Sequence, residues 1–217
     1  MRVRDRLGIG PRSQRRLSRA MQVLLVVVVA VGLYGGDAGV VANGAASLAI
    51  TFLPAALERD AGIPMDSGVT LWITTAVFLH ALGTLALPGA ELSIYRSVGW
   101  WNHLTHALSS SVVAAGGYAT IRAIDVHVEG VSVPHRVMFV FILLFVLAFG
   151  VLWEVFEFAL GELAAATGTR TVLTQYGLAD TMLDLVFDAL GGLAVAAGGH
   201  VYLSDVVDGL VDRLGGR

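Results

Sequence analysis

The sequence predicts an all-α integral membrane protein, a bundle of about six transmembrane helices with a cytoplasmic N-terminus. Three observations support this fold class. First, 56% of the 217 residues are hydrophobic and only 14% are charged, whereas about 25% are charged in an average soluble protein. Second, the apolar residues gather in segments of about 20 residues, the length at which a helix crosses the hydrocarbon core. Third, glycine and proline separate these segments, so neither a soluble domain nor a long linker is expected.

Six apolar segments qualify as membrane-spanning helices. The second segment is the least typical because it is rich in alanine and glycine. The fifth begins with VMFVFILLFVLAFGVLW, the most hydrophobic run of the chain. Each segment is long enough to cross the bilayer, where a helix satisfies all of its own backbone hydrogen bonds. The segments are Leu17–Gly36, Val40–Leu57, Val69–Pro88, Trp100–Ile121, Val137–Leu160 and Met182–Leu203.

The domain organisation and the localisation follow from these segments. Residues 1–16 are predicted to form a basic cytoplasmic tail, residues 17–203 a single helical bundle, and residues 204–217 a short amphipathic segment. Seven of the first nineteen residues are arginine, and basic segments remain on the cytoplasmic side of a membrane. Six crossings return the C-terminus to that side. The predicted localisation is therefore the cell membrane, crossed several times.

Composition excludes several classes of function. The chain has no cysteine, which excludes disulfides, thiolate metal sites and a cysteine nucleophile. The basic residues are concentrated in the N-terminal tail, so nucleic-acid binding is not expected. The sequence contains no His-Glu-x-x-His, no Gly-x-Ser-x-Gly and no Walker loop. The partner that composition does predict is the lipid bilayer.

Ionisable side chains from three segments are predicted to lie at one depth, near the outer end of the bundle. The motif WWNHLTHALSS opens the fourth segment with two histidines on one helical face. The motif WEVFEF closes the fifth segment with two glutamates, and DTMLDLVFD opens the sixth with aspartates at every fourth position, which form one stripe. A charged group at membrane depth costs at least ~2.5–3.5 kcal/mol, so these groups need partners or a function. The predicted cluster contains His103, His106, Glu154, Glu157, Asp180, Asp184 and Asp188.

The chemistry of this cluster suggests a divalent metal ion, although the sequence leaves its identity unknown. Imidazole and carboxylate together suit zinc, manganese or iron. In this hypothesis Glu154 or Glu157 is the catalytic base that acts on a metal-bound water. His80 in the third segment and Arg170 in the loop between the fifth and sixth segments are predicted substrate contacts, Arg170 for a phosphate headgroup. The predicted metal ligands are His103, His106, Asp180, Asp184 and Asp188.

Simpler interpretations exist for each motif. The histidines beside Trp100 and Trp101 could form an interfacial polar belt. Glu154 and Glu157 could lie near the water at the end of their helix, and Asp180 could be only the N-cap of the last helix. If the second segment did not cross the membrane, the whole cluster would move to the cytoplasmic side, but it would still move together.

The second half of the chain resembles the VanZ-like and the related YjdF-like membrane proteins. Asn102-His103-Leu104-Thr105-His106-Ala107 is similar to their Asp-Lys-x-x-His-Phe motif, WEVFEF to their glutamate-bearing helix, and TQYGLADTMLDLVFDALGG to their final aspartate-rich helix. Asn102 stands where the family has an acid and His103 where it has lysine, and the acid expected after Thr-Gln is missing. The resemblance implies a polytopic helical membrane protein and, for some VanZ-type members, an association with glycopeptide resistance. It implies no established reaction.

Three functions remain open at this stage. The first is metal-assisted chemistry on a lipid or envelope precursor at the outer leaflet. The second is a small proton- or ion-coupled transporter, in which the same acids and histidines form a relay. The third is a non-catalytic scaffold or accessory subunit, in which the polar cluster only holds three helices together.

Overall fold

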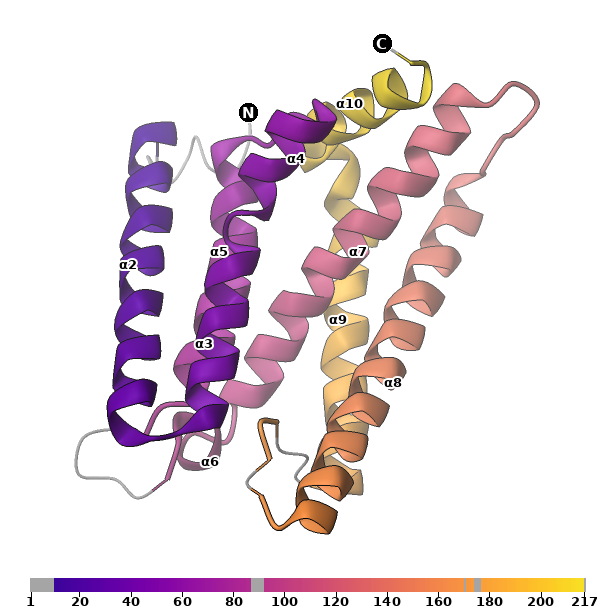
Figure 1. The fold of residues 1–217 in the computed structure, drawn as a ribbon. Coiled ribbons are helices and arrows are strands. Elements are labelled where there is room, and N and C mark those ends of the chain that lie inside the picture. The colour runs from indigo at the N-terminus through magenta and orange to yellow at the C-terminus, as the bar shows by residue number, and fades with distance from the viewer. Residues whose placement is uncertain (1–9, 87–91, 170, 174–176, 217) are drawn as a thin grey trace.

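The described part of the chain is almost entirely helical, which confirms the predicted all-α class. The structure is a computed structural model that describes residues 10–86, 92–169, 171–173 and 177–216. Its long helices run alternately between the two ends of one bundle, and α2 begins at the end where α10 finishes (Figure 1). The helices are α2 (Pro11–Gly35), α3 (Ala38–Ile50), α4 (Leu53–Ala61), α5 (Ser67–Gly83), α6 (Ile94–Ser97), α7 (Trp101–His127), α8 (His135–Thr167), α9 (Leu178–Tyr202) and α10 (Ser204–Leu214).

The second predicted span is built from two helices rather than one. The helices α3 and α4 are separated by Thr51 and Phe52. Pro54 lies in the first turn of α4, where the N–H that proline lacks would have no helical partner. Together α3 and α4 run the length of the bundle (Figure 1), and their 24 residues, Ala38–Ala61, are long and apolar enough to cross a membrane. The segment is therefore a candidate membrane span, as the predicted topology requires.

Four helical segments in the described chain are long and apolar enough to span a membrane: α2, the α3–α4 pair, α8 and most of α9. The helix α5 is apolar but shorter, at 17 residues. The helix α7 has 27 residues but lies outside this apolar set, because its first half is rich in histidine, serine and threonine. It packs mainly on α9, and α5 packs on α2, α3 and α7. Because α5 and α7 contact several other helices, they can be shorter or more polar than the helices that face lipid.

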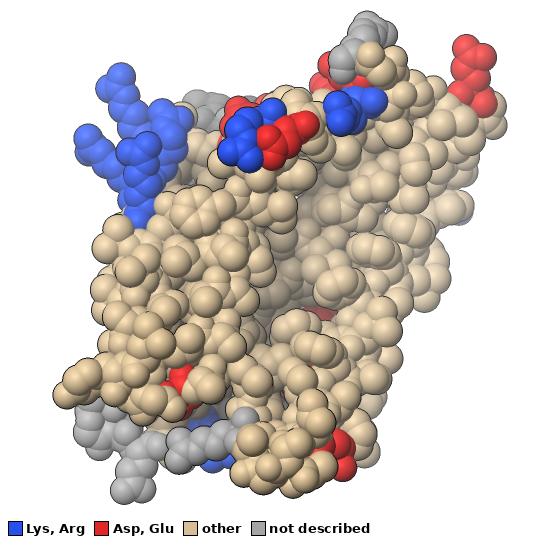
Figure 2. Space-filling model, in the orientation of Figure 1, with Lys and Arg blue, Asp and Glu red and all other residues tan. Residues whose placement is uncertain are grey.

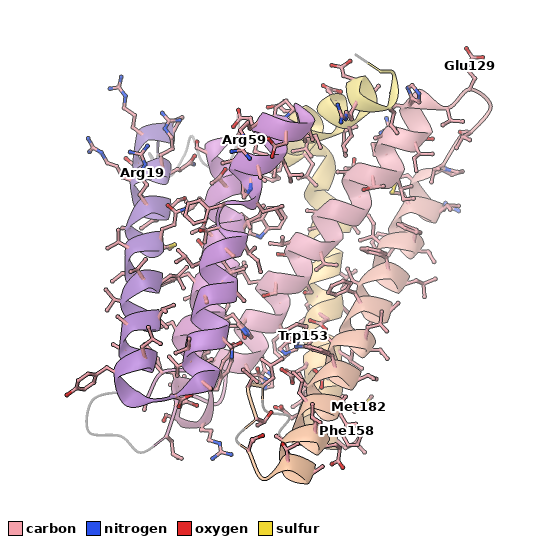
Figure 3. The ribbon with its side chains drawn as sticks, viewed as in Figure 1. Arg19, Arg59, Glu129, Trp153, Phe158 and Met182 are labelled. Atoms are coloured by element: carbon pink, nitrogen blue, oxygen red, sulfur yellow. The ribbon has the colours of Figure 1, made fainter. Side chains whose placement is uncertain are left out.

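The surface of the bundle is that of a membrane protein. Large apolar side chains of α8, such as Leu144, Leu152 and Val155, are exposed, which is typical of a face that contacts lipid. Figure 2 shows a broad uncharged belt between the two ends, with arginine gathered mainly at the end where α2 begins. Arg19, Arg59 and Glu129 lie at that end, whereas Phe158 and Met182 lie towards the other (Figure 3). The positive-inside rule assigns the arginine-rich end to the cytoplasm.

The helices α7 and α9 meet through a glycine. A Cβ atom at Gly191 of α9 would collide with the backbone carbonyl of Ala107 and with the hydroxyl of Ser110, both on α7. Small residues allow such close helix contacts in membranes. The helices α8 and α9 also approach closely, since a Cβ atom at Gly150 of α8 would collide with the carboxylate of Asp188. Gly191 and Gly150 therefore allow the polar residues of α7, α8 and α9 to lie close to one another.

The sidedness can be tested directly, because the chain contains no cysteine. Tyr34, at the end of α2, is 97% exposed, and Glu129 lies exposed at the opposite end of the bundle (Figure 3). We expect a membrane-impermeant maleimide to label Tyr34→Cys on intact cells and Glu129→Cys only after permeabilisation. The reverse pattern would place the N-terminus outside.

The α7–α9 contact predicts a matched pair of glycine substitutions. Gly191→Ala should destabilise the protein by about 1–3 kcal/mol, because the added methyl group forces two backbones apart. Gly198 lies on the same helix, and the space that a Cβ atom would take there is open. Gly198→Ala should therefore leave the thermal midpoint unchanged or raise it slightly. Thermal unfolding in detergent measures both. Equal thermal midpoints for the two variants would show that the close approach of α7 and α9 at Gly191 does not affect the stability of the protein.

Candidate metal centre

The structure brings the ionisable residues of α7, α8 and α9 together at the end of the bundle opposite the start of α2. His103 Nδ1 lies 3.3 Å from Asp184 Oδ1, and His106 Nδ1 lies 3.2 Å from Asp188 Oδ1. Asn102 Nδ2 donates to Asp184 Oδ2 at 2.8 Å. Asp184 and Asp188 are 2% and 4% exposed, so their charges are buried and depend on these partners.

The ring of His106 is held with one nitrogen towards Asp188 and the other towards Asp184. An ionised Asp188 can only accept a hydrogen bond, so Nδ1 of His106 donates to it. In the neutral ring Nε2 then carries the lone pair, and this atom lies 3.7 Å from Asp184 Oδ2. A histidine fixed by a carboxylate at one nitrogen, with the other nitrogen free to ligate, is the usual arrangement at metal sites in proteins.

Glu154 supplies a buried oxygen without a partner. Its side chain is 5% exposed, and its Oε2 accepts a hydrogen bond from the Thr181 hydroxyl at 2.7 Å. Among the residues that the structure describes, Oε1 of the same carboxylate has no hydrogen-bond partner. A buried carboxylate oxygen left in this way is strongly unfavourable unless it meets a cation or a proton.

Three residues of the cluster could share one metal ion. One ligand atom each from His106, Glu154 and Asp184 lies within 4.8 Å of the others. Ligands bound at 2.0–2.2 Å to one tetrahedral ion are about 3.3–3.6 Å apart. The three ligand atoms would therefore have to move closer together, by up to about 1.5 Å, to close around an ion. One imidazole and two carboxylates are a donor set suited to zinc, manganese or iron.

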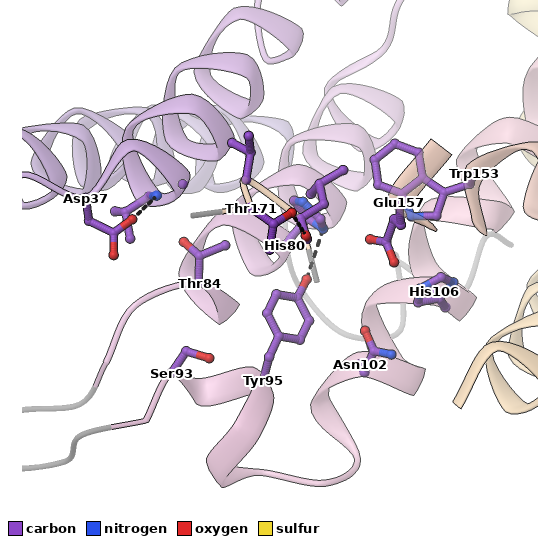
Figure 4. A pocket seen from close by; sticks show the side chains of 14 residues that line it. Asp37, His80, Thr84, Ser93, Tyr95, Asn102, His106, Trp153, Glu157 and Thr171 are labelled. Carbon is purple, nitrogen blue, oxygen red and sulfur yellow. Dashed lines mark hydrogen bonds between the residues drawn. The ribbon is translucent and has the colours of Figure 1, made fainter. Parts of the chain in front are cut away.

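A polar cavity of about 170 Å³ lies against this group. His106 and Asn102 line the cavity and also belong to the group of polar side chains from α7, α8 and α9. Glu157 lines the cavity beside Trp153 (Figure 4). The other walls come from α3, α5, α6 and residues 171–173. The residues that complete the lining are Asp37, Gly39, Val40, His80, Thr84, Ser93, Tyr95, Thr171, Val172 and Leu173.

His80 belongs to a hydrogen-bond network in the wall of the cavity. The amide nitrogen of Asn43 donates to the carbonyls of Gly39 at 2.9 Å and Val172 at 2.8 Å. The amide oxygen of Asn43 therefore faces His80 Nε2, at 3.0 Å, and accepts a hydrogen bond from its N–H. His80 Nδ1 lies 2.9 Å from the hydroxyl of Tyr95, which donates to it when the ring is neutral. The network joins α3, α5 and α6 to the loop before α9.

The predicted site residues fall into distinct positions. His103, His106, Glu154, Asp184 and Asp188 meet directly in one cluster. Asp180 lies at its margin, where Asn102 Nδ2 donates to it at a longer 3.5 Å. His103 also stacks on Phe187, with ring centroids 4.6 Å apart. Glu157 and His80 line the adjoining cavity. Arg170 lies outside the described residues.

Sequence reasoning missed four residues that shape the cavity: Asp37, Asn43, Tyr95 and Trp153. Asn43 carries the clearest signal that could have found it, because it is the one amide in an otherwise small and apolar segment, AGVVANGAASLAI. Asp37 and Tyr95 lie between the predicted spans, where nothing in the pattern distinguishes a residue that lines a cavity from a residue exposed to water. Their contribution depends on how the short connections fold back over α5.

Comparisons with known proteins identify the family but no activity. A family model described as "Predicted membrane protein (DUF2238)" matches residues 17–205. An uncharacterised protein of Thermotoga maritima is 30% identical over 145 residues, which cover 67% of this chain and 68% of that protein. No solved structure matches. Together with the spanning helices, the family match confirms the predicted multi-pass membrane localisation. The chain belongs to the DUF2238 family of predicted membrane proteins.

Proposed function

We propose that this protein is a membrane enzyme that binds a divalent metal ion and uses it on a lipid or envelope precursor at the outer end of the bundle. The observation that carries the proposal is the convergence of His106, Glu154 and Asp184, in which a buried oxygen of Glu154 has no hydrogen-bond partner in the described chain. A cluster that served only to hold helices together would gain stability by pairing this oxygen. A metal ion would satisfy it.

The geometry favours a division of roles that differs in part from the one proposed from sequence. His106, Glu154 and Asp184 are the proposed ligands, so Glu154 acts as a ligand rather than as a base. Asp188 orients the His106 ring through Nδ1. Glu157 is the proposed general base, because it lines the cavity that His106 also borders.

The proposed reaction is the displacement of a leaving group from a phosphate ester by water. A divalent ion held by His106, Glu154 and Asp184 would supply the charge that lowers the pKa of water, and Glu157 would accept a proton from the attacking water. The water oxygen forms a bond to phosphorus while the bond from phosphorus to the alcohol oxygen breaks. That alcohol oxygen then receives the proton from Glu157, so protons and charge balance.

The position of the site supports a substrate from the membrane or the envelope. The cavity lies at the end of a bundle whose flanks are apolar and exposed (Figure 2), so a lipid could present its headgroup there without leaving the bilayer. The resemblance of the Asn102–Ala107, WEVFEF and TQYGLADTMLDLVFDALGG motifs to VanZ-like and YjdF-like proteins agrees with a role at the envelope.

Metal content tests the proposal. After growth with added zinc or manganese, the purified protein should carry about one ion per chain. Glu154→Gln and Asp184→Asn should each abolish this, because each removes a charged ligand. Glu162→Gln, at an exposed glutamate on the same helix as Glu154, is the matched control and should retain the metal. Elemental analysis measures all four proteins.

Three results would contradict the proposal. Absence of metal from the parent protein after supplementation would exclude it. If Glu154→Gln kept the metal and only shifted the thermal midpoint, the cluster would be a structural staple between helices. Metal-independent ion flux in proteoliposomes that is lost in Glu157→Gln would favour the transporter instead.

The role of Asp188 gives a separate prediction. Asp188→Asn should weaken metal affinity by about 10–100-fold while one ion still binds at saturation, because the amide orients and polarises His106 less well than the carboxylate does. A competition titration with a metal-binding dye measures the affinity. Unchanged affinity would show that Asp188 does not act through His106.

A further inference from the structure

The charges around the polar cavity are unbalanced. Six acidic residues lie at this end of the bundle, either beside the candidate metal ligands or in the cavity wall: Asp37, Glu154, Glu157, Asp180, Asp184 and Asp188. One divalent ion would neutralise only two of them. Among the described residues that line the cavity there is neither lysine nor arginine. An anionic ligand alone would be repelled here, whereas a ligand that also carries a positive group would be attracted.

The far side of the cavity is rich in hydrogen-bond acceptors. Asp37, Thr84 and Ser93 lie there, away from His106 and Glu157 (Figure 4). Asp37 Oδ1 caps α3 by accepting from the backbone N–H of Val40 at 3.1 Å, and Asp37 lines the cavity. The hydroxyl of Thr84 donates to the carbonyl of Ala81 at 2.7 Å, so its oxygen can accept. Ser93 begins α6 without a side-chain capping bond.

We propose that this side of the cavity binds the primary ammonium group of an amine-bearing phosphate ester, with Asp37 as its counter-charge. A primary ammonium has three N–H donors and no acceptor, which matches the oxygens of Asp37, Thr84 and Ser93. A quaternary ammonium has no N–H to donate and prefers aromatic faces, but the Tyr95 hydroxyl in this wall is already turned towards His80. The phosphate end of the substrate would then lie at the proposed metal ligands His106, Glu154 and Asp184. This placement of the phosphate rests on the proposed function.

The test uses binding rather than activity. Metal-loaded protein in detergent is titrated with phosphoethanolamine and with glycerol 3-phosphate, which has the phosphate but no amine. We expect phosphoethanolamine to bind more tightly. Asp37→Asn should weaken phosphoethanolamine binding by about tenfold, the effect of losing a hydrogen bond to a charged group. It should not weaken glycerol 3-phosphate binding, and it should leave the metal content unchanged.

The substitution is chosen so that the fold survives. Asparagine caps a helix about as well as aspartate, so α3 should keep its first turn. Asp66→Asn is the matched control: Asp66 caps α5 by accepting from the backbone N–H groups of Gly68 and Val69, both at 2.8 Å, but it lies outside this cavity. It should change neither affinity.

The outcomes separate this proposal from the proposed function. Equal affinities for the two phosphate esters, or equal weakening of both by Asp37→Asn, would overturn the amine site even if the metal binds. If the parent protein holds no metal, ethanolamine alone is titrated, and loss of its binding in Asp37→Asn still supports the amine site.

Tighter binding of a short-chain phosphatidylethanolamine than of phosphoethanolamine would assign the amine to a lipid headgroup. Equal binding of these two would assign it to a soluble compound.

Discussion

The contact between the His106 imidazole and the carboxylates of Asp184 and Asp188 is the interaction on which the polar end of this bundle depends. It requires α7 and α9 to approach until only a glycine fits between them, which Gly191 provides. It also sets the ring orientation, since Nδ1 faces one aspartate and Nε2 the other. With His106 fixed, Asn102 one turn earlier reaches Asp184. The cluster therefore follows from backbone packing as much as from its charges.

The acids of this cluster are buried, so their stability depends on the partners that they find inside the bundle. Acids at membrane depth are unfavourable unless they are paired, and the bundle pairs most of them internally through His103, His106, Asn102 and Thr181. The pairing is incomplete at Glu154, whose second oxygen is buried without a partner in the described chain. This incomplete pairing is the observation on which the proposed metal site rests.

The adjoining cavity shows how short connections contribute to a membrane site. Its walls come from the cap of α3, the end of α5, the small helix α6 and residues 171–173, all at one end of the bundle. The network through Asn43, His80 and Tyr95 ties these parts together. Because each side chain of the network is engaged by another, the wall can hold its shape where Asp37 and Ser93 line the cavity.

The sequence by itself determined the membrane class, the alternating direction of the helices and the meeting of three ionisable motifs at one end. Each of these follows from local pattern: apolar length sets the spans, and helical periodicity places residues three or four apart on one face. The tertiary structure decided which atoms meet. It paired His106 with Asp188, left an oxygen of Glu154 unpartnered, split the second span at Thr51 and brought Asp37, Asn43 and Tyr95 into the cavity wall. These features depend on helix rotation, on the approach allowed by individual glycines and on the path of short connections, and no periodic pattern in one chain encodes them.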